Sequence, residues 1–199
     1  RCYGSDPAQV SAICVAVARG YLAEGVLPVV KHMPGHGRTT VDAHHDLPTV
    51  TASRDQLAAL DFAPFRAVND LPMAMTGHLI FTAYDDKHPA TQSATMIRVI
   101  RDEIGFDGLL MTDDLNMQAL TGDLSQRTGR PMAAGCDIAL HCKGDLAEMQ
   151  MVAAAAGVMT PAARLRATRA LQARQIPDPI DIADLIADFS ALMAEKIHG

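Results

Sequence analysis

Titratable side chains crowd one short segment, VVKHMPGHGRTTVDAHHDLP, which occupies residues 29–48. It holds four histidines, two aspartates and a lysine directly after a short apolar run. Such a run followed by Gly, Pro and charged residues is typical of a buried strand that leads into a loop. Three interpretations fit this loop: a metal site, an acid/base device, or charges that are simply hydrated.

A metal site would draw its ligands from the histidines and one aspartate, namely His32, His36, Asp42, His44 and His45. Their spacing matches no helical HExxH pattern, and the loop is rich in Gly and Pro. Catalytic zinc usually takes its ligands from rigid, well-spaced positions, so metal is the weaker interpretation.

Simple hydration is the better interpretation for Arg38, His45 and Asp46 taken singly. It fits Lys31 and His32 less well, because they interrupt the end of a buried strand, where an unused charge is costly.

Acid/base chemistry is the third interpretation. Asp42 and His44 are two residues apart, so both side chains can project from one turn. The aspartate can accept a hydrogen bond from one ring nitrogen, which fixes the tautomer and stabilises the imidazolium. The other ring nitrogen is then available to exchange protons.

A second acidic site ends the stretch FDGLLMTDDL, in which Asp113 and Asp114 are adjacent. Glycoside hydrolysis requires a carboxylate that faces a proton donor across a small gap. The alternative is that the pair only caps a following helix. Two acids are more than one cap needs, so one could cap while the other reacts.

The elements that position these residues are expected to alternate between helix and strand. Helical spacing of apolar residues, with Pro or Ser at the start and Gly at the end, predicts helices over 7–24 and 92–104 and, more weakly, over 124–134. A further helix is predicted to begin at Ser53 and to be kinked or split at Pro64. The tail is predicted to be helical, with breaks near Pro161 and Pro177–Pro179. Short apolar runs predict strands over 27–33, 71–80, 106–115 and 136–142.

Strands separated by helices pair in parallel, and their carboxyl ends meet at one edge of the sheet. In α/β folds that edge holds the functional site. Each predicted strand ends in polar residues, which are Lys31, His32, His78, Asp113, Asp114 and His141. The histidine loop and the Asp-Asp pair are therefore expected to share one pocket.

Composition narrows the class of protein. The chain has 199 residues, of which 49% are apolar and 4% aromatic, and its net charge is −6. We expect a core of Ala, Leu, Ile, Val and Met. The scattered basic residues make nucleic acid and anionic membrane poor partners. No apolar run approaches the ~20 residues of a membrane span. The cysteines at 2, 14, 136 and 142 form no CxxC pair and are expected to be free thiols.

Several of these segments together resemble family 3 glycoside hydrolases of the β-N-acetylglucosaminidase type, the bacterial cytoplasmic enzymes of cell-wall recycling. The similar segments are KHMPGHGRTTVDAHHDLP, FDGLLMTDDLNM, AAGCDIALHC, MTGHLIFTAYDDKHPAT and the opening RCYGSDP. The resemblance runs from Arg1 to about Lys143 and weakens in the helical tail.

The resemblance implies catalytic roles for three matching residues. Asp113 would be the nucleophile that forms a covalent glycosyl-enzyme. His44 would be the general acid/base, with Asp42 as its partner in a dyad. The substrate would be terminal, non-reducing β-linked N-acetylglucosamine in anhydro-muropeptides, and neither a metal nor an organic cofactor would be needed.

Binding roles are implied for Lys31 and His32, which would hydrogen-bond sugar hydroxyls, and for Arg1, which would also bind substrate. The chain departs from the family pattern at three positions. Met33 replaces an aromatic residue, Ala43 replaces a small hydroxyl residue, and Lys143 stands where the family often has Asn. Two alternatives stay open: a variant that passes the intermediate to phosphate, and a non-catalytic, sugar-binding remnant.

The fold implied by the resemblance is an α/β (β/α)8 TIM barrel, which typically needs ~250 residues. We expect residues 1–199 to form one domain with about the last five βα units and a helical tail from about 145. The N-terminal half of the barrel would be missing and would be the natural partner of this chain. The location implied is cytoplasmic.

Overall fold

A parallel sheet lies at the centre of the computed structural model, which describes residues 3–39, 46–177, 179 and 181–195. Its four strands run in the order β1-β3-β5-β6. They are β1 (Val29–Met33), β3 (Met73–Thr76), β5 (Leu109–Asp114) and β6 (Ile138–Leu140). Every neighbouring pair is parallel, as the alternation of helices and strands predicts. Within the described ranges no pairing closes this sheet into a barrel, and β1 and β6 form its edges.

The register is regular in the middle of the sheet and irregular toward the carboxyl ends of two strands. Between β3 and β5 the partners advance one by one, from Met73 opposite Leu109 to Met75 opposite Met111. The β1–β3 register shifts between Val30 and Met33, and the β5–β6 register shifts between Met111 and Asp114. Irregularities of this kind re-aim side chains, and here they fall at the polar ends of the strands.

A second, two-stranded parallel sheet pairs β2 (Thr49–Val50) with β4 (Ile80–Phe81). It connects the segment after the histidine loop to the segment after β3. The Ile80 amide donates to the Pro48 carbonyl at 2.8 Å, which extends the pairing by one residue.

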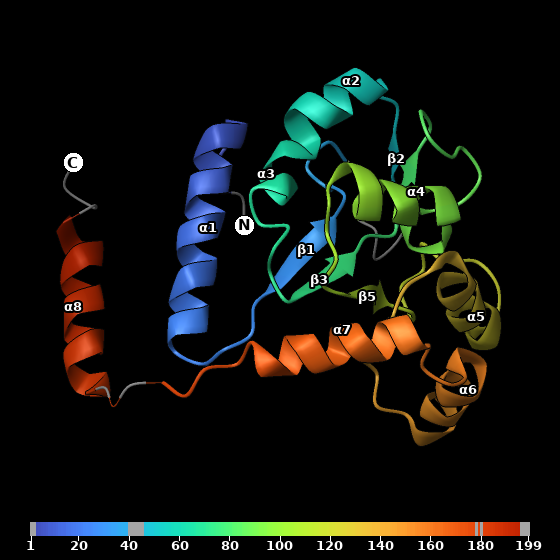
Figure 1. Cartoon of the computed structure of the whole chain (residues 1–199). Coiled ribbons are helices and arrows are strands. Elements are labelled where there is room, and N and C mark those ends of the chain that lie inside the picture. Colours follow the sequence, from blue (N-terminus) through green and yellow to red (C-terminus); the bar gives the residue numbers. More distant parts are fainter. Residues whose placement is uncertain (1–2, 40–45, 178, 180, 196–199) are drawn as a thin grey trace.

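Helices alternate with the strands in the order expected from the sequence (Figure 1). They are α1 (Pro7–Ala23), α2 (Arg54–Gln56), α3 (Ala63–Arg66), α4 (Ala94–Arg98), α5 (Leu124–Ala134), α6 (Leu146–Ala156), α7 (Pro161–Gln172) and α8 (Ile182–Glu195). Shorter helical turns are η1 (Leu57–Asp61), η2 (Ala90–Gln92) and η3 (Val99–Glu103). Helix α1 packs against α3, and α5 packs against α6.

The signals at the helix ends operate as predicted. The Ser53 side chain accepts from the Gln56 amide, and the Gln56 side chain accepts from the Ser53 amide, so the capping box is present. The helix that follows is split around Phe62, and Pro64 lies in the first turn of α3, where its missing amide hydrogen is not needed. Gly105 ends the next helical segment with a φ of +82°, a conformation that favours glycine.

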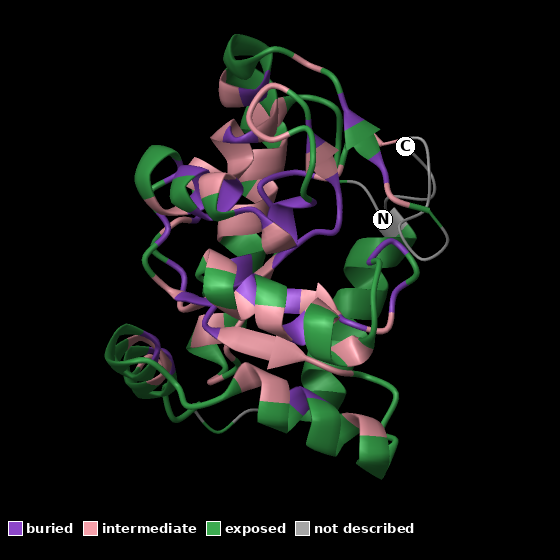
Figure 2. Cartoon of the chain, turned by 90° about the vertical axis from the view of Figure 1, so that its right-hand side faces the viewer, coloured by how far each residue is buried: buried purple, intermediate pink, exposed green. Residues whose placement is uncertain are grey.

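The core contains more aromatic side chains than the composition suggests. Phe62, Phe81 and Phe106 are fully buried, so the expectation of a purely aliphatic core is wrong. The rings of Phe62 and Phe81 meet edge to face with centroids 6.4 Å apart. Figure 2 shows the buried residues gathered around the strands. The chain has few aromatic residues, but three of them lie at the centre of its hydrophobic core.

Helix α7 is fixed to the amino-terminal edge of the sheet by charge. Asp137, directly before β6, accepts from Arg101 Nη2 at 2.8 Å, from Arg166 Nη1 at 3.0 Å and from the Leu110 amide at 3.0 Å. Burial lowers the pKa of the Arg101 guanidinium, and the neighbouring Asp137 carboxylate acts in the opposite direction. One buried carboxylate thus joins η3, β5 and α7.

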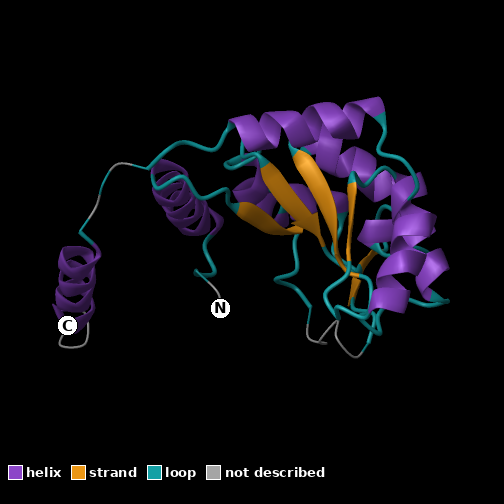
Figure 3. Cartoon of the chain, turned by 90° about the horizontal axis from the view of Figure 1, so that it is seen from below, coloured by secondary structure: helices purple, strands orange, loops and turns teal. Residues whose placement is uncertain are grey.

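The tail ends in a helix that stands apart from the rest (Figure 3). Its described positions from Ile182 to Ala194 are all exposed. The helical tail is broken near Pro161 and Pro177, as predicted: α6 ends at Ala156, Pro161 begins α7, and Pro177 precedes the last helix. The assignment of the whole chain to one domain stays a prediction.

The thiols at Cys14, Cys136 and Cys142 are free, as expected from their spacing, whereas Cys2 lies outside the described residues. No helix in the described part is long and apolar enough to cross a membrane.

We predict that Asp137→Ala lowers the free energy of unfolding by about 3–5 kcal/mol, because it leaves the Arg101 guanidinium buried without a carboxylate. Urea denaturation followed by circular dichroism measures the loss. The matched control is Asp107→Ala, because Asp107 also pairs with Arg166 but its side chain is 65% exposed. That control should lose only about 0–1 kcal/mol. Equal losses would show that the buried network does not anchor α7.

Candidate active site

Residues from β1 and β5 meet at the carboxyl edge of the sheet. His32, near the end of β1, places its Nε2 atom 3.4 Å from Oδ2 of Asp113, near the end of β5. Strand β3 lies between these two strands, so the His32 side chain must cross its end. Figure 3 shows how the strands converge toward this end of the sheet, where the loops gather.

Gly77 makes this crossing possible. It follows β3 directly, and a Cβ atom there would lie 3.2 Å from Cβ of His32 and 2.8 Å from Cδ2 of Leu79. Its amide also donates to the Met33 carbonyl at 3.1 Å, which fixes the end of β1. The sequence gives no signal for this role, because the glycine follows an ordinary strand pattern.

Burial controls the protonation of His32. It lowers the pKa of His32 from 6.5 to about 4, and the Asp113 carboxylate opposes this only in part. His32 is therefore neutral at pH 7 and can both donate and accept a hydrogen bond. The Lys31 side chain is exposed beside it at the same strand end.

The two oxygens of the Asp113 carboxylate have different surroundings. Oδ1 accepts from the Asp114 amide at 2.8 Å. Oδ2 lies toward His32, and the side chain retains 18% of its exposure. A partly exposed carboxylate with one oxygen free can act as a nucleophile or as a base.

Asp114 has a structural role. Its Oδ1 accepts from the amides of Asn116, at 3.2 Å, and Cys142, at 3.1 Å, so it closes a turn and ties β5 to the end of β6. The alternative that the acidic pair caps the next helix is wrong, because Asp123 is the N-cap of α5 and accepts from the Gln126 amide.

The other two predicted strand-end histidines are engaged elsewhere. His78 is fully buried and contacts Thr91 and the Asp114 backbone. Nε2 of His141 donates to Glu148 at 2.9 Å, and Lys143 donates to the other oxygen of Glu148 at 2.5 Å. Lys143 therefore pairs with a carboxylate of α6.

The predicted residues Arg1, Asp42 and His44 lie outside the described residues, and so does His45. The structure brings His32 and Asp113 together, and Lys31 is exposed at the same strand end. The described stem of the histidine loop is held by Arg38, whose Nε donates to Asp61 at 2.8 Å. This salt bridge means that Arg38 is more than a hydrated charge.

Two of the candidate metal ligands, His32 and His36, lie in the described residues. His32 and His36 place their ring centroids 5.8 Å apart. Among the described residues, no group of three or more His, Cys, Asp or Glu side chains is placed to hold a metal ion.

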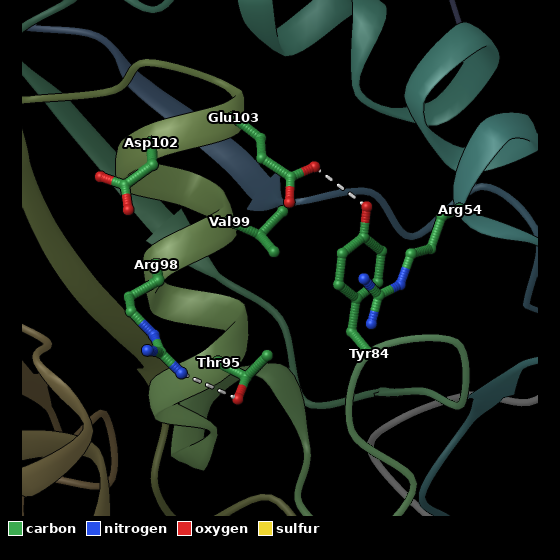
Figure 4. A pocket seen from close by; sticks show the side chains of 7 residues that line it. All are labelled: Arg54, Tyr84, Thr95, Arg98, Val99, Asp102 and Glu103. Carbon is green, nitrogen blue, oxygen red and sulfur yellow. Dashed lines mark hydrogen bonds between the residues drawn. The ribbon is translucent and has the colours of Figure 1, made fainter.

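A separate cleft of about 200 Å³ lies between α2 and the α4–η3 segment (Figure 4). It is lined by Arg54, Tyr84, Thr95, Arg98, Val99, Asp102 and Glu103. The Tyr84 hydroxyl donates to Glu103 at 3.0 Å, and the Arg54 guanidinium stacks 4.5 Å above the Tyr84 ring. Burial, with the Glu103 carboxylate, raises the pKa of Tyr84 to about 12. Arg54, Tyr84 and Glu103 thus interact with one another, and none of the predicted site residues that the structure describes lines this cleft.

Comparisons with known proteins point to one family. The family model described as the glycosyl hydrolase family 3 N-terminal domain matches residues 1–171. A β-hexosaminidase of Bordetella avium is 31% identical over 183 residues, which cover 89% of this chain and 51% of that protein. A β-hexosaminidase of Alkalilimnicola ehrlichii is 40% identical over 151 residues, which cover 71% of this chain and 42% of that protein. The chain thus spans about half the length of the curated relatives it matches.

Solved structures give the same result. A family 3 β-N-acetylglucosaminidase from a Paenibacillus species superposes with a TM-score of 0.80 at 29% identity, over 90% of this chain and 37% of that one. NagZ from Neisseria gonorrhoeae, in complex with N-trifluoroacetyl-D-glucosamine, superposes with a TM-score of 0.73 at 29% identity, over 83% of this chain and 48% of that one.

We predict that His32 stays neutral above about pH 5 and that Asp113→Asn lowers its pKa below about 4, because the substitution removes the carboxylate that favours the imidazolium. NMR titration of the imidazole nitrogens measures both values. A His32 pKa near 6.5 that is the same with and without Asp113→Asn would contradict the contact between the two side chains.

Proposed function

Because this chain belongs to glycosyl hydrolase family 3, we propose that it carries the nucleophile of a retaining β-N-acetylglucosaminidase. The reaction is hydrolysis of terminal, non-reducing β-linked N-acetylglucosamine. The observation that carries the proposal is the approach of His32 to Asp113 within 3.4 Å at the carboxyl edge of a parallel sheet. Polar side chains from separate strands converge there, as they do at the active edge of α/β enzymes.

The proposed first step forms a covalent glycosyl-enzyme. An oxygen of Asp113 bonds to the anomeric carbon while the bond from that carbon to the leaving oxygen breaks. The leaving oxygen keeps the electron pair and takes a proton from His44, which Asp42 holds in the required tautomer. In the second step His44 removes a proton from water, whose oxygen displaces Asp113 from the sugar.

Lys31 and His32 bind the sugar in this proposal. A neutral imidazole and an ammonium group can hydrogen-bond neighbouring hydroxyls without adding a second negative charge beside Asp113. Arg1 is also assigned to substrate binding, on the resemblance of the opening RCYGSDP alone.

We further propose that the four-stranded sheet is part of a (β/α)8 barrel. The two edge strands, β1 and β6, present unpaired backbone groups that additional strands could complete. The half-length match to the relatives supports this, because a whole barrel requires more chain than these residues supply. The N-terminal half of such a barrel is the expected partner.

We propose an N-acylated glucosamine as the sugar and a muropeptide as the aglycone. The complex of the similar gonococcal protein with N-trifluoroacetyl-D-glucosamine supports an N-acylated glucosamine in the site. Muropeptides from peptidoglycan as the aglycone, and a cytoplasmic location, rest on the family resemblance. A phosphorolytic variant differs only in what attacks the intermediate, so dependence of turnover on phosphate distinguishes the two.

We predict that a fluorinated N-acetylglucosamine-type inactivator adds its mass to the peptide containing Asp113. Asp113→Asn should abolish the label without changing the far-UV circular dichroism, because an amide is a poor nucleophile. The matched control is Asp123→Asn, which keeps an N-cap acceptor for α5 and should be labelled normally. A folded but unlabelled chain would favour the sugar-binding remnant instead.

We also predict that His44→Ala slows substrates with poor leaving groups by about 10²–10⁴-fold, while substrates with good leaving groups lose much less. Good leaving groups depart with little proton donation. Steady-state rates on a series of aryl N-acetylglucosaminides, graded by the pKa of the leaving phenol, measure the difference. Equal losses across the series would remove His44 as the general acid.

A further inference from the structure

His78 occupies an unusual position for a polar side chain. It lies between β3 and β4 and is fully buried. Nδ1 lies 2.9 Å from the Thr91 hydroxyl, and Nε2 lies 3.0 Å from the backbone carbonyl oxygen of Asp114. A carbonyl oxygen can only accept a hydrogen bond, so Nε2 must carry a proton.

The charge state of His78 follows from its burial. Burial lowers the pKa of His78, so the ring is neutral and its single proton lies on Nε2. Both ring nitrogens are occupied by protein groups and neither reaches solvent. His78 therefore cannot exchange protons with a substrate, and its interactions serve to hold other groups in place.

Asp114 is the residue that His78 holds. Its carbonyl accepts from His78, and its carboxylate accepts from the amides of Asn116 and Cys142. Its own amide donates to Oδ1 of Asp113 at 2.8 Å. The orientation of the Asp113 carboxylate is thereby linked to a residue fixed from three directions.

The same segment also fixes β1. The Gly77 amide donates to the Met33 carbonyl at 3.1 Å. Gly77 and His78 are adjacent, so one dipeptide connects the carboxyl ends of β1 and β5. Those ends carry the contact between His32 and Asp113.

We propose that His78 is a positioning residue for Asp113: it holds the end of β5 so that Oδ1 stays bonded to the Asp114 amide and Oδ2 forms the bond to the anomeric carbon. The proposal rests on the proposed function. In the covalent step the Oδ2–carbon bond forms as the bond to the leaving oxygen breaks, and that oxygen keeps the electron pair and takes the proton of His44.

The test compares His78→Leu, which has no donor, with His78→Gln, whose amide nitrogen can reach the Asp114 carbonyl. We expect His78→Leu to lower the maximal rate of covalent labelling of Asp113 about 10–100-fold, with half-saturating inactivator unchanged, and His78→Gln to restore most of it. If His78 only stabilised the fold, His78→Leu would not lower the maximal labelling rate while leaving the half-saturating inactivator concentration unchanged.

A second measurement does not depend on catalysis. Hydrogen exchange of the Asp114 amide, followed by NMR in folded samples, should accelerate in His78→Leu and stay slow in His78→Gln. The matched control is Ser93→Ala, because Ser93 is also buried and caps α4 but does not contact Asp114. That control should leave both the labelling rate and the Asp114 exchange unchanged.

The outcomes are distinguishable. Equal labelling rates and equal Asp114 exchange in the His78→Leu and unsubstituted chains would overturn the positioning role. A folded, unsubstituted chain that takes no label would overturn the proposed function, while the exchange comparison would still decide whether His78 holds the end of β5.

Discussion

Two aspartate side chains fix β5 against β6, one at each end, and the rest of the candidate site depends on that pairing. At the amino-terminal edge, Asp137 accepts from the Leu110 amide and from two arginines. At the carboxyl edge, Asp114 accepts from the amide of Cys142. Hydrogen bonds to charged groups are among the stronger ones in proteins, especially where solvent is excluded. With β5 held at both ends, the Asp113 side chain has a fixed position and direction at the carboxyl edge of the sheet, where it lies beside His32.

The histidines illustrate how the surroundings decide what one side-chain type does. His78 is enclosed and holds a backbone carbonyl, whereas His32 keeps part of its exposure beside Asp113. His141 donates to a carboxylate of α6. All three end predicted strands, and their sequences alone do not separate these roles. The difference arises from the partners that tertiary packing places around each side chain.

Local signals allowed much of the fold to be predicted. The capping box at Ser53 and the bounds of α5 are confirmed, because both depend on residues close in sequence. The placement of His32 and Asp113 at one edge follows from parallel pairing. The structural role of Asp114 could not be predicted, since it depends on Cys142, 28 residues away. The π-helical turns and the shifts of register were also beyond the sequence, because tertiary packing decides them.

Gly77 sets a limit on how this region can vary. All other chiral residue types carry a Cβ atom, which here would lie 2.8 Å from Cδ2 of Leu79 and 3.2 Å from Cβ of His32. Natural drift or a combinatorial library aimed at new sugar preferences can therefore sample the neighbouring positions, while a change at this one requires the Leu79 side chain and His32 to shift as well.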